Sequence, residues 1–385
     1  MLLAKAKAKR RRQYDDIGSV SQFGKGFSVS SFSKQGRRPY QEDRIDTILD
    51  LLSSDIINNC HMKTVRNLQS RIGINCTLRL FTVVDGHAGD RAAKYIVSHL
   101  TETFWTVAKS VLFDNANASK DDDDNTTTRP TTTTQPKQKH STPTEEILFC
   151  SILKQTLSTI DKNWLNEMKN TRINDGACVL VCLLVDDCRW YFAHLGDCRA
   201  VFVRGTKAIS ITKDHTPDPK DKRETARIAL AGGKVVKKGA IYRVCAGGTK
   251  IAVTRAIGDK NMKRLRDAND TPVLSSEADT NVLVTGQTVS GSDGSSEGNN
   301  WTMVLVSDGV TCRMKNKAIA SCLRTATRLD SVKSFSQGGT GNGVTKGSTK
   351  DEENGEGVNL AQVLVERAYQ NGSFDNISAV VIRPQ

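Results

Sequence analysis

Apolar positions along the chain repeat with two periods, and these periods separate predicted helices from predicted strands. Apolar residues recur with helical spacing over 92–104 and 148–164, which predicts two helices that each bury one face. Shorter helices are expected after Pro219, over 318–326 and over 360–369. Short apolar runs between turn residues predict strands over 22–33, 81–84, 177–185, 190–195, 200–204, 208–212, 241–244, 250–253, 301–306 and 377–382.

The order of these elements predicts the fold class. The four runs from 177 to 212 are joined by short turns, so we expect them to form an antiparallel meander. Strands grouped together, with helices before and after them, favour an α+β fold. We therefore expect a sandwich of two antiparallel β-sheets packed face to face, with helices on the outside.

Two polar stretches and a basic tail interrupt this pattern. Residues 114–144 hold an acidic run and a threonine tract, and residues 330–357 are rich in glycine, serine and threonine. Neither stretch has enough apolar residues to offset the entropy of ordering, so both are predicted to be disordered insertions. Residues 1–21 are predicted to be a basic tail. Its first twelve residues are interpreted as a solvated segment, with a nuclear-localisation or membrane-surface patch as the alternative. One domain, residues 22–385, is expected.

Composition narrows the class of protein. A chain of 385 residues that is 37% hydrophobic can bury a large core, and no stretch is long and apolar enough to span a bilayer. The formal charge of +13 favours acidic partners, but no aromatic and basic interleaving accompanies it, so nucleic-acid binding is not expected. Ten cysteines without a CxxC pair indicate a reducing compartment. We expect a monomer in the cytoplasm, the nucleus or both.

Candidate chemistry begins where the apolar run 81–84 ends in Asp85, Gly86 and His87. A carboxylate followed by a closely approachable carbonyl suits a hard cation such as Mg²⁺ or Mn²⁺, although a simple turn with a surface histidine would give the same local pattern. Further acids stand at strand ends or near them: Glu42, Asp43, Asp197, Asp308 and Asp375. Buried acids are costly unless a cation neutralises them, so a metal centre is favoured.

The ordered motifs together resemble those of one enzyme family. They are Arg38 with Glu42-Asp43, Asp85-Gly86-His87-Ala88-Gly89, Gly196-Asp197-Cys198-Arg199, Asp214-His215 with Gly232-Gly233, Thr254 to Asp259, Ser307-Asp308-Gly309 and Asp375-Asn376-Ile377-Ser378. This series resembles the metal-dependent protein phosphatases of type 2C, or PPM family, over about residues 22–384 without the insertions. The resemblance implies an αββα sandwich and hydrolysis of phosphoserine and phosphothreonine in phosphorylated protein substrates.

The resemblance also implies a role for each site residue. Asp85 would bridge two Mg²⁺ or Mn²⁺ ions, Gly86 would give its carbonyl to the first, and Asp308 and Asp375 would hold the second. The two ions would activate a shared water for in-line attack on phosphorus, without a covalent intermediate. Glu42 and Asp43 would order metal-bound waters. Arg38 would bind the phosphate, and His87 would protonate the leaving oxygen.

Two positions depart from the family pattern. Cys312 stands where family members often carry an acid that holds a third metal together with the residue matching Asp197, so a third metal is in doubt. The run Asn174 to Ala177 replaces a pattern rich in serine and threonine, and we expect altered packing there with the chemistry kept.

Two other functions are compatible with parts of the sequence. Cys198 with Arg204, and Cys322 with Arg328, have the spacing of a cysteine-nucleophile phosphatase, but neither pair lies on the glycine-rich anion loop that such chemistry requires. A catalytically weak or silent family member that binds phosphoproteins as a scaffold is the stronger alternative. Retention of Asp85, Asp308 and Asp375 favours the active enzyme.

Overall fold

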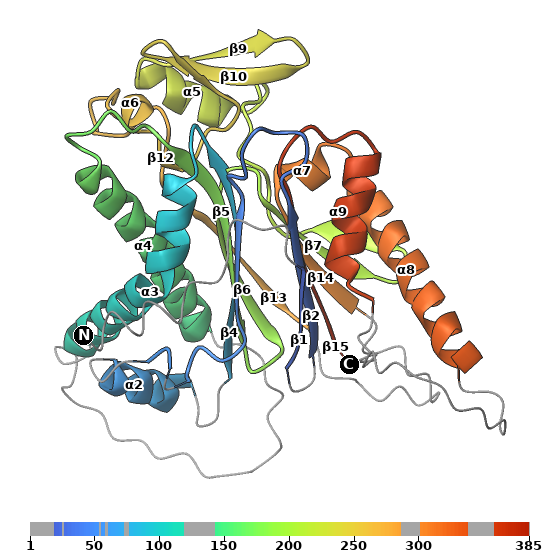
Figure 1. Ribbon diagram of the computed structural model, residues 1–385. Coiled ribbons are helices and arrows are strands. Elements are labelled where there is room, and N and C mark those ends of the chain that lie inside the picture. Colours follow the sequence, from blue (N-terminus) through green and yellow to red (C-terminus); the bar gives the residue numbers. More distant parts are fainter. Residues whose placement is uncertain are drawn as a thin grey trace. The chain divides into compact units, whose positions relative to one another are not determined.

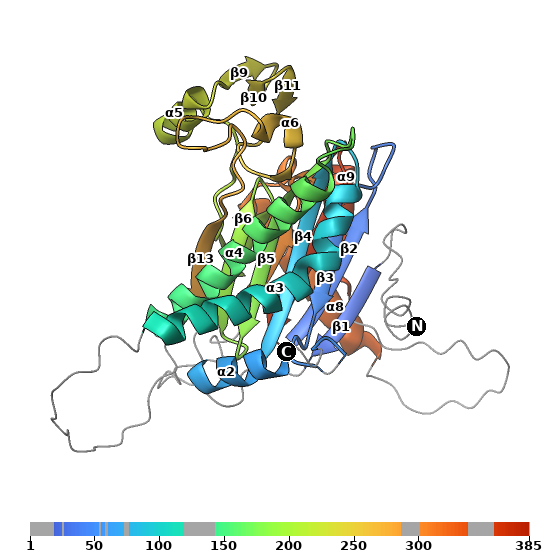
Figure 2. The same ribbon diagram turned by 90° about the vertical axis from the view of Figure 1, so that its left-hand side faces the viewer.

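A computed structural model describes residues 19–24, 27–53, 55–57, 61–72, 77–118, 143–285, 301–337 and 358–384. The described elements fall into two compact units. Of the described residues, those within 19–45, 199–211 and 301–384 form the terminal unit, and those within 46–198 and 212–285 form the central unit. Figures 1 and 2 show the elements from two sides.

The terminal unit is built on a six-stranded antiparallel sheet with the order β1-β2-β15-β14-β7-β8. Helices α8 and α9 pack against each other, and α9 packs on β2 and β15 (Figure 1). Their shared core includes Val304, Val306, Ile319 and Leu364, all fully buried. The elements are β1 (Ser19–Gly24), β2 (Phe27–Lys34), β7 (Arg199–Arg204), β8 (Lys207–Ser210), β14 (Trp301–Val306), α7 (Asp308–Thr311), α8 (Asn316–Gln337), α9 (Leu360–Gln370) and β15 (Ile377–Pro384).

The central unit carries a second antiparallel sheet with the order β13-β6-β5-β4-β3, and β12 pairs with β5. Helices α3 and α4 pack together and cover this sheet (Figure 2). Every residue of β5 is buried, as expected for a ten-residue apolar run at the centre of a sheet. The elements are β3 (Arg44–Ile48), α2 (Met62–Ile72), β4 (Leu78–His87), α3 (Arg91–Ala118), α4 (Pro143–Glu167), β5 (Gly176–Val185), β6 (Arg189–Leu195), β12 (Ile257–Gly258) and β13 (Asp279–Val284).

A small subdomain of the central unit follows His215. It contains α5 (Lys222–Leu230), β9 (Lys234–Lys238), β10 (Ile241–Ala246), β11 (Thr249–Ile251) and α6 (Lys260–Lys263). The three strands form a separate antiparallel sheet with the order β11-β10-β9, and α5 packs against β9. Asp221 caps α5 by accepting a hydrogen bond from the Glu224 amide, so the helix begins after Pro219 as the sequence predicts.

The helix and strand content confirms the α+β prediction, but two details of the strand pattern differ. Residues 22–33 are not one strand, because β1 and β2 pair as antiparallel neighbours. The predicted meander is also wrong: β5 pairs with β6 in the central sheet, whereas β7 pairs with β8 and β14 in the terminal sheet. The apolar pattern marks strands but does not state the partner of each strand.

The predicted insertions lie mostly outside the described residues. Within the described part, residues 114–118 continue α3 and residues 143–144 begin α4, while residues 330–337 continue α8. The basic tail, residues 1–21, is described only from residue 19, where β1 begins. Among the described residues, no helix is both long enough and apolar enough to cross a bilayer.

Candidate metal and phosphate site

In the central unit, the Asp85-Gly86-His87 motif forms the last residues of β4. These three residues pair with Cys178, Ala177 and Gly176 of β5, so the neighbouring strand fixes their register. The chain then turns through Ala88 and Gly89, both with positive φ, and enters α3. Asp85 is therefore held at the end of a buried strand, as the sequence predicts.

His87 has a partner that sequence reasoning did not identify. Its Nε2 lies 2.7 Å from Oδ2 of Asp259, a buried residue in the left-handed conformation. Gly176 makes room for this pair: a Cβ there would lie 2.0 Å from the Asp259 carboxylate and 2.4 Å from His87 Nε2. The Thr254 to Asp259 motif could have suggested an acid near the site, but no local pattern links it to His87.

Asp175 belongs to the run 174–177, which departs from the family pattern, and it stabilises the start of α3. Its buried carboxylate accepts hydrogen bonds from the backbone and side chain of Arg91 at 2.9 to 3.2 Å. Its carbonyl accepts from the Asp259 amide. Asp175 therefore ties α3, β5 and the Asp259 segment together around His87.

Asp197 lies in the turn after β6, next to Gly196. Gly196 has φ +91°, and a Cβ there would lie 2.2 Å from the Cys178 sulfur, so only glycine fits. Burial raises the pKa of Asp197, and a hydrogen bond from the Cys178 thiol opposes this effect. The raised pKa reflects the loss of the water that would otherwise stabilise the charged Asp197 carboxylate. A bound cation would stabilise that charge instead.

A stacked histidine pair supports the turn that carries Asp197. The His194 and His215 rings stack at 4.5 Å between centroids. Nδ1 of His215 accepts a hydrogen bond from the Gly196 amide at 3.1 Å, and Nε2 of His215 lies 3.1 Å from Asp279 Oδ2. His194 is fully buried, and burial lowers its pKa to about 4, with the neighbouring His215 as a further cause. The His194 ring is therefore uncharged at neutral pH.

His194 should make stability depend on pH. A base whose folded pKa is about 4, against 6.5 when unfolded, contributes stability above pH 6.5 that is lost as pH falls toward 4. Between pH 7 and pH 4.5 the wild type should lose about 2 to 3 kcal/mol of unfolding free energy relative to His194→Phe. Urea unfolding of both proteins at both pH values measures this difference. The other titrating groups contribute equally to the two proteins, so their effects cancel in the comparison. Parallel pH profiles would contradict the assignment.

In the terminal unit, Asp308 and Asp375 stand at one end of a strand pair. β14 and β15 are antiparallel, with Val306 opposite Ala379, so the end of β14 and the start of β15 meet. Asp308 begins α7 directly after β14 and Ser307. Gly309 must be glycine, since a Cβ there would lie 1.9 Å from the Asn376 carbonyl oxygen. The two predicted acids are thus brought to the same sheet edge.

Arg38 and Glu42 lie in the loop after β2, beside this edge. Arg38 Nη2 donates to Asp375 Oδ2 at 2.6 Å, and this hydrogen bond raises the pKa of Arg38. The side chain of Asn376 accepts from the Glu42 amide and donates to the carbonyls of Gln35 and Tyr40. Asn376 therefore fixes the loop that presents Arg38 and Glu42.

Asp43 is a buried acid behind the site. Its Oδ2 accepts hydrogen bonds from the hydroxyls of Ser307 at 2.9 Å and Ser378 at 2.7 Å. Its Oδ1 is buried without a hydrogen-bond partner among the described residues, and burial raises the pKa of Asp43 to about 7. Such an oxygen is one that an ordered water or a cation would stabilise.

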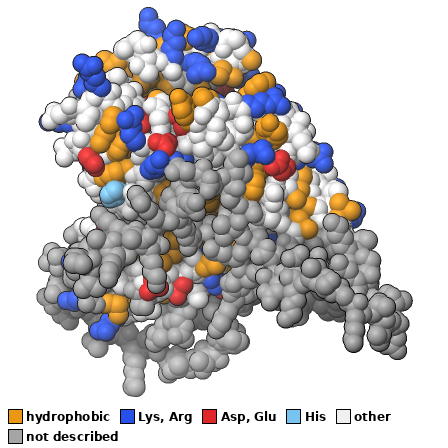
Figure 3. Space-filling view, in the orientation of Figure 1, with side chains coloured by type: hydrophobic (Ala, Val, Ile, Leu, Met, Phe, Trp, Pro, Cys, Tyr) orange, Lys and Arg blue, Asp and Glu red, His pale blue; other side chains and the backbone are white. Residues whose placement is uncertain are grey.

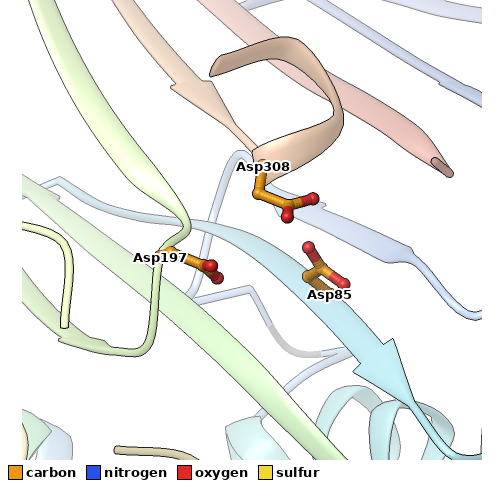
Figure 4. A group of neighbouring side chains, drawn as sticks. All are labelled: Asp85, Asp197 and Asp308. Carbon is orange, nitrogen blue, oxygen red and sulfur yellow. The ribbon is translucent and has the colours of Figure 1, made fainter. Parts of the chain in front are cut away.

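Asp85, Asp197 and Asp308 form an acidic group that could hold a metal ion (Figure 4). One carboxylate oxygen from each lies within 4.8 Å of the others, and each side chain is partly exposed. Asp375 is not in this group, and Cys312 directs its thiol to the Gly309 carbonyl at 3.4 Å. The sequence assigns Asp197 only to a doubtful third metal, whereas in the structure its carboxylate lies close to those of Asp85 and Asp308.

The cysteine-nucleophile alternative finds no support in the geometry. Cys198 is buried, and Arg204 lies at the end of β7. Cys322 and Arg328 both lie within α8. Burial raises the pKa of Cys322, which keeps it as an unreactive thiol.

Comparison with known proteins identifies the family. Residues 59–377 match the family described as Protein phosphatase 2C. "Probable protein phosphatase 2C 69" of Arabidopsis thaliana is 27% identical over 366 residues, which is 95% of this chain and 72% of that protein. "Probable protein phosphatase 2C 59" of the same plant is 26% identical over 366 residues, 95% of this chain and 82% of that protein.

A solved structure shows the same fold. The serine-threonine phosphatase 2C from Toxoplasma gondii has a TM-score of 0.62 and 17% sequence identity, covering 96% of this chain and all of that one. The predicted α+β sandwich is confirmed by this likeness, and the prediction of a protein phosphatase is confirmed by the family match. The chain belongs to the protein phosphatase 2C family.

Proposed function

We propose that this protein is a Mg²⁺- or Mn²⁺-dependent phosphatase that hydrolyses phosphoserine and phosphothreonine in proteins. The observation that carries the proposal is the acidic group of Asp85, Asp197 and Asp308. Family membership supports the reaction, and the predicted substrates are phosphorylated proteins. The silent-scaffold alternative is not favoured, because the acids that would bind metal are all kept.

The residues present fit hard divalent cations. Asp85, Asp308 and Asp375 supply carboxylate oxygens, and Gly86 supplies a carbonyl, which are the ligands that Mg²⁺ and Mn²⁺ prefer. Asp197 would join them, and the unpaired oxygen of Asp43 would order water behind them. We propose two ions in each protein. When bound, such ions lower the pKa of water and neutralise charge on a phosphate ester.

Arg38 is the group that would bind the phosphate. Its side chain is half exposed, and its ion pair with Asp375 holds the guanidinium beside the proposed ligands. A guanidinium offers two parallel donors to phosphate oxygens and offsets the charge that develops in the transition state. The loop fixed by Asn376 would therefore hold a phosphate beside Asp375.

His87 is the group that would protonate the leaving oxygen. Nε2 lies 2.7 Å from the Asp259 carboxylate, so Nδ1 is the ring nitrogen that would give its proton to the leaving oxygen. Asp259 also fixes the orientation of the ring. General acids of this kind contribute about 10² to 10⁴ in rate.

Metal removal is the direct test of this function. Hydrolysis of a phosphothreonine peptide should fall at least about 100-fold after chelation and return with added Mn²⁺, because the ions supply several kcal/mol of transition-state stabilisation. Release of inorganic phosphate measures the rate. Full activity in excess chelator would exclude the mechanism, and peptide binding without hydrolysis in Mn²⁺ would favour the scaffold.

Replacing Arg38 should weaken phosphate binding in the transition state. Arg38→Ala is expected to lower kcat/KM for the phosphopeptide about 10² to 10³-fold, by loss of a charged donor pair. Arg37→Ala is a matched control, since Arg37 stacks on Tyr369 and Phe374 and does not pair with Asp375. Steady-state kinetics of both variants measure the change in kcat/KM for the phosphopeptide. Equal losses in the two variants would argue for a general effect on the loop.

A further inference from the structure

The three-stranded sheet of the small subdomain has two chemically different faces. The register places Lys237 opposite Tyr242, and Val235 opposite Val244, on the face that is buried at Val244 and Ala246. The other face, called here the basic face, carries side chains from all three strands. It consists of Lys234, Val236 and Lys238 on β9, Ile241, Arg243 and Cys245 on β10, and Lys250 on β11.

Every charged side chain on the basic face is a cation. Lys234, Lys238 and Lys250 are exposed, Arg243 is partly exposed, and the sequence from 234 to 250 contains no Asp or Glu. No ion pair of these four cations occurs among the described side chains, whereas Arg227 and Arg255 of the same subdomain pair with Glu224. In Figure 3, Lys and Arg side chains gather at the top of the view, over β9 and β10 of Figure 1. Like charges placed together without acids favour an anionic partner.

Exposed apolar side chains lie among these cations. Val236 is 37% exposed and Ile241 is 48% exposed. Val236 lies opposite Arg243, and Ile241 lies opposite Lys238, so apolar and basic groups alternate across the strands. Among the described elements, β9 and β11 each pair only with β10, which leaves their outer edges open. An extended segment that pairs with one of these edges would project every second side chain onto the side of the basic face, so acidic residues that alternate with apolar ones would all lie beside its cations.

We propose that the basic face binds an extended acidic segment of a partner protein, in which Asp or Glu alternates with apolar residues. A protein segment fits better than nucleic acid, because Tyr242, the aromatic residue of these strands, lies on the opposite face and leaves no base-stacking platform. It also fits better than a lipid surface, since the exposed apolar side chains of this face are Val236 and Ile241, and it carries no Trp, Phe or Leu of the kind that inserts at a membrane interface. This inference concerns docking and does not rest on the proposed hydrolysis.

Fluorescence anisotropy of the full-length protein tests the proposal. The probe is a fluorescein-labelled 12-residue peptide that alternates Glu with Val or Thr, and a second peptide carries Lys in place of each Glu. The wild type should bind the acidic peptide at least about tenfold more tightly than the basic one at low ionic strength, and added salt should weaken binding. The triple variant Lys234→Glu, Lys238→Glu, Lys250→Glu should lose about tenfold or more in affinity.

The matched control reverses three charges off the basic face. Lys220→Glu, Lys222→Glu, Arg223→Glu changes the net charge by the same amount, at exposed positions before and within α5, and should change affinity by less than about threefold. Should the first triple variant fail to fold by circular dichroism, the single variants Lys238→Glu and Lys250→Glu replace it, each with a loss of about two- to fivefold. Equal binding of both peptides, or equal losses in the two triple variants, overturns the proposal. Tighter binding of single-stranded DNA or of phosphatidylserine vesicles than of the acidic peptide overturns it as well.

Discussion

Replacing Asp85 with asparagine is expected to lower phosphopeptide hydrolysis by about 10³-fold while leaving the fold intact. Asp85 ends a buried strand and belongs to the acidic group with Asp197 and Asp308. Asparagine keeps the shape of the aspartate side chain and removes its charge, so the substitution weakens cation binding and leaves the packing unchanged. A loss of several kcal/mol in transition-state stabilisation corresponds to a factor of this size.

Asp50→Asn is the control for this prediction, since Asp50 is an exposed acid of the same unit that accepts a hydrogen bond from the Leu52 amide. It should retain wild-type kcat/KM. Thermal unfolding of both variants in chelator separates a local effect from a loss of fold. Retention of more than about a tenth of the wild-type rate in Asp85→Asn would remove Asp85 from the proposed centre.

The second large effect is expected in the stability of the segment that carries Asp259. Asp161 of α4 is buried, and its carboxylate accepts hydrogen bonds from Lys263 Nζ and from the Gly258 amide at 2.8 Å. Lys263 is also buried and donates to the Ala256 carbonyl. Asp161→Ala would leave a buried ammonium without its counter-charge, and should lower the unfolding free energy by about 3 to 5 kcal/mol.

An exposed ion pair on the same helix provides the comparison. Lys154 pairs with Glu277 at 2.8 Å, with 45% and 65% of the two side chains exposed, so Lys154→Ala should cost less than about 1 kcal/mol. The double variant Asp161→Leu, Lys263→Met should recover much of the loss, because apolar residues can replace a buried pair. Urea unfolding measures all three. A cost below about 1 kcal/mol for Asp161→Ala would show that water compensates the lysine.

The parts of the fold that the sequence predicts are those with strong local signals. Buried runs such as β5 and β14, and the helical repeats of α3 and α4, are read from apolar spacing alone. β9 is missed because three of its five residues are lysine, and its strand conformation comes from pairing with β10. Strand partners are missed for a related reason. The turn at Gly196 sends the chain from one sheet into another, and nothing in the local pattern marks this change.

The site shows the same division. Asp85 and Asp308 follow apolar strands, so their places at strand ends follow from the sequence, and the resemblance supplies their roles. The contact between His87 and Asp259 joins residues 172 positions apart, and it depends on the absence of a side chain at Gly176. No periodicity reports such a contact. The sequence also does not place Asp197 beside Asp85, because the distance between them is set by strand pairing and by the close approach of Gly196 to Cys178.

The central claim is that acids far apart in the sequence surround a pair of divalent ions. Crystals grown with Mn²⁺, with diffraction recorded at the manganese absorption edge, would locate the ions by their anomalous signal. Two manganese peaks are expected next to the Asp85 carboxylate, with Asp308 and Asp375 on one of them, and at least one peak should be lost in Asp308→Asn. Manganese bound elsewhere, or no peak beside Asp85 at saturating Mn²⁺, would contradict it.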